Sequence, residues 1–342
     1  MIGVDLGGTN VRAQAIFEDG KPAGEYKKNS SHAQQGTEAI VDSVVNTIRE
    51  AISVAEGEVV GIGLAVPGHI DDRTGLVRWA PNFGRDVDGV FISWKDVPLK
   101  RMLEDQLDFP VSMGNDANLA ALGEYRYGIG RGSARCLVLL TIGTGIGGGV
   151  IMAPSSVMGE AFGPLMLIGS NAGGAELGHI IIQQGGLDAT AGTYGALEAY
   201  CQRDAIVKRA QYKLQREHDL KNSVLWSLVE GNLARITPQI IASAAEHGDV
   251  IALDTYAEVG TYMGVGVGSF INVFAPDIVA IGGQIAKAGD CLMDPLRKSA
   301  KNTAIPTLFE SCQIELAELL DDAGILGAAA LSFQAINARR AS

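Results

Sequence analysis

Short apolar runs broken by glycine turns open the chain. The stretch IGVDLGGTNVRAQAIF, residues 2–17, has the pattern of a strand, a glycine turn and a second strand. A third strand is expected near residues 24–28. Between residues 37 and 55, apolar side chains recur at helical spacing, and Thr37 is a candidate N-cap. The stretch VVGIGLAVPG, residues 59–68, then predicts a buried strand that ends at a Pro-Gly break.

The second half of the chain repeats this beginning. RCLVLLTI, GTGIGGG and VIM again give a strand, a glycine turn and a strand, which indicates two similarly built halves. No low-complexity segment or flexible linker separates them, so the halves should meet at a cleft. The other predicted elements are a helix near 96–107, the strand FPVSM (109–113), a helix from Asp116 towards Tyr127, helices between about 195 and 272, the strand IVAIGG (278–283) and a helix near 324–338.

The composition indicates a globular protein with sizeable cores. Its 342 residues are enough for two domains, and 47% are apolar against 19% charged. The formal net charge of −12 disfavours nucleic acid and anionic membrane surfaces as partners. No apolar run reaches the roughly 18 residues of a membrane span, and Asp5 and Arg12 interrupt any signal peptide. The four cysteines lie far apart, which predicts a reduced, cytoplasmic protein without disulfides.

The first glycine turn has the residues of an anion site. In DLGGTN, Gly7 and Gly8 let backbone N–H groups turn toward an anion without interference from a Cβ. Thr9 adds a hydroxyl donor, and Asp5 could hold a magnesium ion directly or through water. An ordinary tight hairpin accounts for the same glycines, so this motif alone leaves both interpretations open.

Two later glycine turns are ambiguous when taken alone. GTGIGGG, residues 143–149, contains the G-x-G-x-x-G of dinucleotide-binding folds, which requires a helix directly after the glycines. VIM follows and predicts a strand, so a nicotinamide dehydrogenase is disfavoured, and the P-loop motif is absent from the sequence. IGG, residues 281–283, would let a flat base or ribose approach closely, although a simple strand-to-helix turn is the better explanation of it alone.

Candidate side chains for sugar chemistry lie between these turns. Asp116 follows Asn115 at the start of a predicted helix, where Asn and Asp are preferred N-caps. Asp116 is alternatively a general base, because a carboxylate can take the proton of a sugar hydroxyl as a phosphoryl group arrives. Glu176 and His179 in AELGH could present a carboxylate and an imidazole to one polyol. A surface carboxylate and a core histidine are the other interpretation of this pair.

Six motifs occur together in a fixed order across nearly the whole chain: DLGGT, GNDAN, TIGTGIGGG, AGGAELGH, LEAY and IGG. In this order they resemble the ROK family of sugar kinases and repressors, within the actin-like ATPase superfamily. The resemblance implies an α/β fold of two ribonuclease-H-like domains with an interdomain cleft. The small domain would hold residues 1–115 plus about 320–342, and the large domain residues 116–319.

The resemblance also implies an activity and the residues that carry it. The expected activity is that of an ATP-dependent hexokinase with Mg²⁺, and glucose, phosphorylated on its 6-hydroxyl, is the expected substrate. Sugar and ATP would bind from opposite sides of the cleft, whose closure would exclude water. By resemblance, Asp116 is the catalytic base; Asp5 holds Mg²⁺; Gly7, Gly8, Thr9, Asn10, Gly143, Thr144, Gly145, Gly282 and Gly283 bind the nucleotide; and Gly68, Asn82, Asn115, Asp116, Glu176, His179 and Glu198 bind the sugar.

The chain departs from the family pattern in two places. The family carries C-x-C-G-x-x-G-C shortly after the histidine, and these cysteines bind a structural zinc with the histidine. Aligned on LEAY, this chain has Ala189, Ala191 and Ala196 at the cysteine positions, so no structural zinc is expected. The second departure is an extra apolar segment near 153–167, which is expected to cover the cleft or a subunit interface.

Several alternatives stay open at this point. The sugar could be fructose, mannose, allose or an N-acetylhexosamine, because the geometry that discriminates epimers is not readable from a sequence. Polyphosphate is an alternative donor. The alternative of another class is a sugar-sensing ROK-type repressor; such proteins carry an N-terminal helix-turn-helix, whereas this chain starts at its first strand and is acidic. A homodimer in the cytoplasm is the expected state.

Overall fold

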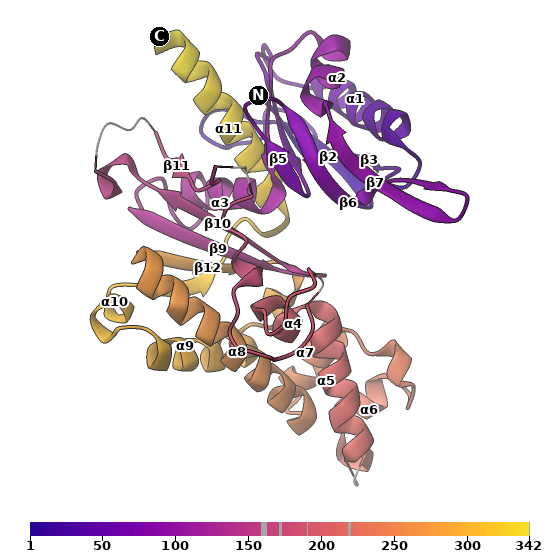
Figure 1. Cartoon of the computed structure of the whole chain (residues 1–342), viewed down its shortest axis with the longest axis vertical. Coiled ribbons are helices and arrows are strands. Elements are labelled where there is room, and N and C mark those ends of the chain that lie inside the picture. Colours follow the sequence, from indigo (N-terminus) through magenta and orange to yellow (C-terminus); the bar gives the residue numbers. More distant parts are fainter. Residues whose placement is uncertain (159–162, 171–172, 190, 218–219, 342) are drawn as a thin grey trace. The chain divides into compact units, whose positions relative to one another are not determined.

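The chain packs as two compact units (Figure 1). The computed structural model describes residues 1–158, 163–170, 173–189, 191–217 and 220–341. The first unit comprises Met1–Ala134, Gly149–Ala175 and Glu318–Ser342, and the second comprises Arg135–Gly148 and Glu176–Ala317. Residues 116–134 and 149–175 thus pack with the first unit, while the domain boundary expected after residue 115 stays a prediction.

A five-stranded sheet forms the centre of the first unit. Its strand order is β3-β2-β1-β4-β8, with β1 antiparallel to β2 and parallel to β4, and β4 parallel to β8. Every residue of β1 and β4 is buried, which is expected of strands covered on both faces. The strands are β1 (Ile2–Leu6), β2 (Asn10–Ala15), β3 (Lys27–Ser30), β4 (Ile62–Val66) and β8 (Val111–Asn115).

Helices cover the two faces of this sheet. Ile2, Val4 and Leu6 of β1 share an apolar core with α1, whereas a Cβ on the intervening Gly3 would lie 2.2 Å from the carbonyl oxygen of Ile325 on α11. Alternating side chains point to opposite faces of a sheet, so α1 and α11 lie on opposite faces. The helices of this unit are α1 (Thr37–Ser53), α2 (Leu99–Leu107), α3 (Asp116–Arg126) and α11 (Ala323–Ala341).

The start of α1 corrects one prediction. Gly36 occupies the N-cap position and no side chain caps this helix, so the expectation that Thr37 is the N-cap was wrong. The chain enters the helix with a φ of 96° at Gly36, a conformation that glycine adopts without steric cost. The N–H of Gly36 donates to the carbonyl of Gly84 over 2.8 Å, which fixes this entry.

A buried carboxylate joins α3 to the segment that precedes α11. Glu124 is fully buried and accepts hydrogen bonds from the backbone N–H groups of Ile129, Glu318 and Leu319, at 3.2, 3.2 and 2.7 Å. Three donors offset the cost of burying this carboxylate. One side chain thereby links the first and last segments of this unit.

A three-stranded antiparallel sheet, which the sequence analysis did not predict, follows β4. It has the order β5-β6-β7, and Asp88 and Gly89 form the turn of its long hairpin with φ values of 53° and 79°. Both residues therefore have the positive φ of a tight hairpin turn. Figure 1 shows this hairpin extending beyond the helices of its own unit. The strands are β5 (His69–Asp71), β6 (Leu76–Val87) and β7 (Val90–Val97).

The second sheet has the order β11-β10-β9-β12-β13. Strands β9, β12 and β13 run parallel, and β10 pairs antiparallel with β11. Strand β10 begins in the second unit and continues into the first after Gly148. It follows the second glycine turn directly, as predicted, so the dinucleotide fingerprint lacks its helix. The strands are β9 (Cys136–Ile142), β10 (Ile146–Met152), β11 (Leu165–Met166), β12 (Ile278–Gly282) and β13 (Gln313–Leu316).

Helices make up about half of the second unit. The longest, α8, has 25 residues and begins after Asp249, whose carboxylate accepts from the N–H of Ala252 over 2.8 Å. None of the helices in the described ranges combines the length and apolar character that a membrane span requires. The helices are α4 (Leu197–Cys201), α5 (Arg203–Arg216), α6 (Val224–Leu228), α7 (Pro238–Glu246), α8 (Val250–Phe274), α9 (Asp290–Thr303) and α10 (Pro306–Glu310).

Candidate functional site

The predicted site residues fall into two sets, one on each unit. The set on the first unit is Asp5, Gly7, Gly8, Thr9, Asn10, Gly68, Asn82, Asn115 and Asp116. The set on the second unit is Gly143, Thr144, Gly145, Glu176, His179, Glu198, Gly282 and Gly283.

The first glycine turn connects β1 to β2. The N–H of Gly7 donates to the carbonyl of Asn10 over 2.8 Å and closes the turn. Gly8 and Thr9 at its tip are exposed, and a Cβ added to Gly8 would meet no atom within 4 Å. The tip is therefore accessible to a ligand, and its backbone N–H groups are of the kind that bind phosphate.

Asp5, at the end of β1, forms an ion pair with Arg12 of β2. The two residues are register partners across the hairpin, which places both side chains on one face of the sheet. Burial acts to lower the pKa of Arg12, but the charge of Asp5 and its hydrogen bond outweigh burial and raise that pKa. Sequence analysis missed Arg12; its signal was the hairpin register opposite Asp5. A cation bound at Asp5 would have to share this carboxylate with the guanidinium.

Asn115 caps α3, which leaves Asp116 as the first residue of the helix. Asn115 Oδ1 accepts from the N–H groups of Ala117 and Asn118 at 3.0 and 3.1 Å, while Nδ2 donates to the carbonyl of Gly68 over 3.0 Å. Asp116 is half-buried, and its Oδ1 accepts from the N–H of Ala117 at 2.8 Å. Of this pair, Asn115 is therefore the N-cap of α3.

Gly68 directly precedes β5, and Asn82 lies within β6. Gly68 has a φ of 102°, and a Cβ there would lie 2.2 Å from the carbonyl oxygen of Trp79. Asn82 is exposed, at a register irregularity of β6 between Ala80 and Gly84. An irregularity of this kind redirects side chains away from the sheet. Glycine is required at position 68, because any side chain would collide with β6.

The two glycine turns of the second unit lie at the same end of its sheet. Thr141 and Gly282 are register partners in the parallel pair β9–β12. Gly283 follows with a φ of 86°, and a Cβ there would lie 2.4 Å from the carbonyl oxygen of Ile142, the last residue before the Gly143 turn. The structure therefore brings together the residues that resemblance assigned to phosphate and to adenosine.

Glu198 lies against the second glycine turn. Its side chain is buried, and Oε2 accepts from the backbone N–H of Ile146 over 2.9 Å. A Cβ at Gly145 would lie 2.5 Å from the same oxygen. The residue assigned to sugar thus supports a turn assigned to nucleotide, a contact that sequence analysis did not foresee.

Glu176 and His179 flank one short turn. Glu176 is exposed, and its carbonyl accepts from the N–H of His179 over 3.1 Å. Within the described part of the chain, Nδ1 of His179 is one of three buried side-chain nitrogen or oxygen atoms for which no hydrogen-bond partner is found. Glu176 is thus exposed at the start of this turn, His179 is half-buried at its end, and Leu177 and Gly178 between them are buried.

Peptide hydrogen bonds and one tyrosine hold the loop in which the family has zinc. The hydroxyl of Tyr200 accepts from the N–H of Leu187 over 2.9 Å, and the N–H of Gly195 donates to the carbonyl of Leu187 over 2.7 Å. Ala189 and Ala196 are buried. Over the ranges that the structure describes, no group of three or more His, Cys, Asp or Glu side chains is placed to hold a metal ion.

The extra segment near 153–167 lies partly outside the described residues, at 159–162. Its described end is tied to both α11 and β10. Gln334 of α11 donates to the carbonyl of Pro164 over 3.1 Å, and the N–H of Leu167 donates to Val150 over 3.0 Å. Its predicted role as a cover for a cleft or subunit interface stays a prediction.

Known proteins resemble this chain over nearly its whole length. Residues 1–335 match the ROK family. A glucokinase from Thermotoga maritima is 34% identical over 97% of this chain and 96% of its own, and a xylose repressor from Caldicellulosiruptor bescii is 28% identical over 97% and 77%. The crystal structure of a ROK family glucokinase from Streptomyces griseus in complex with glucose and AMPPNP is 31% identical, has a TM-score of 0.78, and covers 98% of this chain and 99% of that chain. Such structures have the two-domain actin-like ATPase fold, so the predicted fold class is confirmed.

Proposed function

The chain belongs to the ROK family, and from this premise we propose that it is a glucokinase-type sugar kinase, transferring the γ-phosphoryl group of ATP to the 6-hydroxyl of glucose. The predicted family and the sugar-kinase class are confirmed by the relatives. The substrate, donor and residue roles below are the proposal.

The proposal rests chiefly on the start of α3. Asn115 caps this helix with Oδ1 and ties it to Gly68 with Nδ2, while Oδ1 of Asp116 accepts from the N–H of Ala117. A carboxylate at the first helical residue is half-buried and remains reachable. Asp116 would take the proton of the attacking hydroxyl as the phosphoryl group arrives.

The nucleotide would be held by the glycine turns. The tip at Gly8 and Thr9 would donate N–H groups and a hydroxyl to phosphate oxygens, and the turns at Gly143 and Gly283 would do the same and admit the adenosine. Asp5 is the residue that fits Mg²⁺, because a carboxylate at a strand end is a hard oxygen ligand. Mg²⁺ bound with ATP would neutralise charge on the transferred phosphoryl group.

The sugar would be oriented by hydrogen bonds from several side chains. Glu176, which is exposed, and His179, which is half-buried, would contact hydroxyls from the two ends of one turn. Asn115 has one Nδ2 hydrogen beyond the bond to Gly68, so it would contact the sugar as a donor only. Glu198 would contact the sugar while supporting the second glycine turn.

A coupled phosphorylation assay across a sugar panel tests this function. Glucose, fructose, mannose, allose and N-acetylhexosamines should each be offered with ATP and with polyphosphate. We expect the highest kcat/KM for glucose with ATP and Mg²⁺. A higher value for another hexose would change the substrate, and no turnover with any sugar would overturn the kinase assignment.

The regulator alternative is favoured by one observation, the 28% identity to a xylose repressor. The net charge of −12 opposes it, because DNA repels an acidic chain. Sugar-dependent DNA binding without turnover would support the alternative. A homodimer in the cytoplasm stays part of the proposal.

A further inference from the structure

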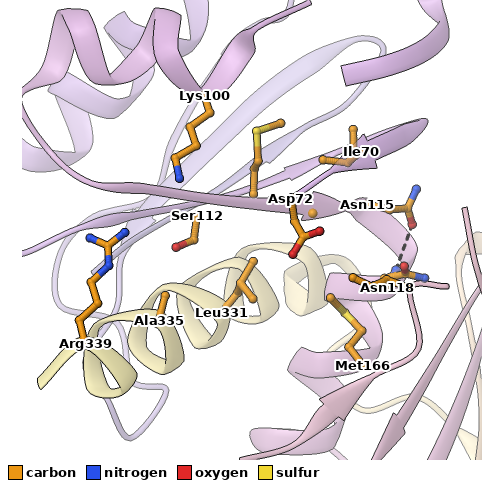
Figure 2. A pocket seen from close by; sticks show the side chains of 13 residues that line it. Ile70, Asp72, Lys100, Ser112, Asn115, Asn118, Met166, Leu331, Ala335 and Arg339 are labelled. Carbon is orange, nitrogen blue, oxygen red and sulfur yellow. Dashed lines mark hydrogen bonds between the residues drawn. The ribbon is translucent and has the colours of Figure 1, made fainter. Parts of the chain in front are cut away.

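A pocket lies within the first unit, along the outer edge of its five-stranded sheet (Figure 2). Its volume is about 210 Å³. Sites for drug-sized ligands are typically about 300–1,000 Å³, so this pocket suits a metabolite. Asp116 is not among the described residues that line it, although Asn115 and Asn118 are.

The floor of the pocket is β8, the last strand of the sheet. The N–H of Ile62 donates to Pro110 over 3.0 Å, whereas the N–H of Val111 turns the other way and donates to Oε1 of Glu104 over 2.9 Å. Backbone groups alternate in direction along a paired strand. Met113, two residues after Val111, therefore also directs its N–H and carbonyl to the outer edge, where Met113 lines the pocket.

The extra segment of this chain supplies one wall. Met166 and Ile168 line the pocket, and the hydrogen bonds of Pro164 with Gln334 and of Leu167 with Val150 hold them there. Leu331 of α11 lies on another wall. One wall of the pocket is therefore formed in part by the extra segment, through Met166, and by Ile168 directly after it.

One end of the pocket is cationic. Figure 2 shows the ammonium of Lys100, the hydroxyl of Ser112 and the guanidinium of Arg339 directed toward the same end. The ammonium of Lys100 lies 3.9 Å from Oε1 of Glu104, which also accepts from the N–H of Val111. Two cations and a hydroxyl form a typical site for a phosphate monoester.

Away from the cationic end, the pocket is polar and carries the opposite charge. The amide of Asn118 lies there beside Asn115, and the carboxylate of Asp72 lies between Ser112 and Asn118 (Figure 2). A carboxylate repels a phosphate but accepts hydrogen bonds from hydroxyl groups. A ligand with a phosphate at one end and hydroxyls at the other would match both ends.

We propose that this pocket binds a small phosphorylated polyol, such as a hexose phosphate. Its phosphate lies among Lys100, Ser112 and Arg339, and its hydroxyls face Asp72 and Asn118. The bound ligand adjoins Asn115, the cap of the helix that begins at Asp116. The proposal rests on the proposed function only in taking the product, glucose 6-phosphate, as the probe.

Calorimetric titration of glucose 6-phosphate into the full chain tests the pocket, with glucose at saturation to occupy the proposed sugar site. Wild type should bind one equivalent. Ala335→Phe fills the pocket and should abolish this binding, whereas Ala338→Phe, on an exposed position of α11, should not. Lys100→Met should weaken binding about tenfold or more, and Arg101→Met, an exposed neighbour on α2, should leave it unchanged.

Two results would overturn the proposal: binding that glucose abolishes, or binding that survives both Ala335→Phe and Lys100→Met. Equal affinity for inorganic phosphate would overturn its polyol part. The melting temperature of Ala335→Phe shows whether this variant folds. If it does not fold, Lys100→Met still tests the pocket. Without added glucose 6-phosphate, Lys100→Met should phosphorylate sugar at the wild-type rate. If the wild type shows no turnover, the proposed function is refuted, and the titration still tests the pocket.

Discussion

The carboxylate of Glu198 accepts a hydrogen bond from the backbone N–H of Ile146, 2.9 Å away. This bond links α4 to the first residue of β10, directly after the turn at Gly143–Gly145. The same oxygen is so close to Gly145 that a Cβ there would lie 2.5 Å from it. The side chain and the turn are therefore one structural unit, although resemblance assigns them to different ligands.

Removal of Glu198 should consequently affect both substrates. Glu198→Ala leaves the buried N–H of Ile146 without its acceptor, which destabilises the turn by about 1–3 kcal/mol, so kcat/KM for ATP should fall by up to roughly 150-fold. Glu198→Gln keeps an acceptor oxygen for the N–H of Ile146. It should therefore restore most of kcat/KM for ATP, while kcat/KM for the sugar stays low. Separate KM measurements for ATP and sugar check this. An unchanged KM for ATP in Glu198→Ala would contradict the coupling.

Glu176→Gln should affect the sugar alone. The exposed carboxylate loses one acceptor for a sugar hydroxyl. We therefore expect kcat/KM for the sugar to fall roughly 30- to 1000-fold, which corresponds to about 2–4 kcal/mol of lost transition-state stabilisation. Its melting temperature and KM for ATP should stay near those of wild type, which makes it the matched control for Glu198. A lower melting temperature with a normal sugar KM would instead assign Glu176 a structural role.

Asp116→Asn should abolish phosphoryl transfer while sugar binding survives. Asparagine keeps the shape of the side chain but cannot accept the proton. Because Asn115 caps α3, the melting temperature should not change by more than a degree or two. Calorimetric sugar binding and single-turnover kinetics measure the two effects. A variant that retains more than about a tenth of the wild-type kcat would remove Asp116 from the role of base.

Apolar runs predicted the strands that build both sheets, because β1, β4, β9 and β12 are buried along their length. The β5–β7 sheet was not predicted because β7 is largely exposed. The sequence of β7 therefore lacks the long apolar run of a buried strand. Its one local signal was the turn Asp88-Gly89, a favoured pair for a two-residue hairpin turn.

Local sequence identified the candidate residues but not their partners. Asn115 and Asp116 are both good N-caps, and only the backbone geometry at the start of α3 assigns the cap to Asn115. Glu198 and Ile146 are 52 residues apart, so no local pattern connects them. Arg12 was accessible in principle, since a two-strand hairpin places it opposite Asp5.

The protein should purify without stoichiometric zinc. Alanines stand at the three positions aligned with thiolate ligands, and alanine has no donor atom. Elemental analysis of protein made without a metal-binding tag measures the content. Zinc near one equivalent that resists chelation would show that other ligands hold it.

In a metal-free loop, Tyr200→Phe should lower the free energy of unfolding by about 0.5–1.5 kcal/mol, because the hydroxyl no longer accepts from the N–H of Leu187.

The loop closed by Tyr200 has a consequence for the cell that makes this protein. Enzymes whose loops close around zinc compete for the ion with every other zinc protein, and their supply of active molecules falls when the ion is scarce. A loop closed only by a phenol and peptide groups, as we predict here, would need no ion from the cell. Sugar phosphorylation by such an enzyme would continue through zinc starvation.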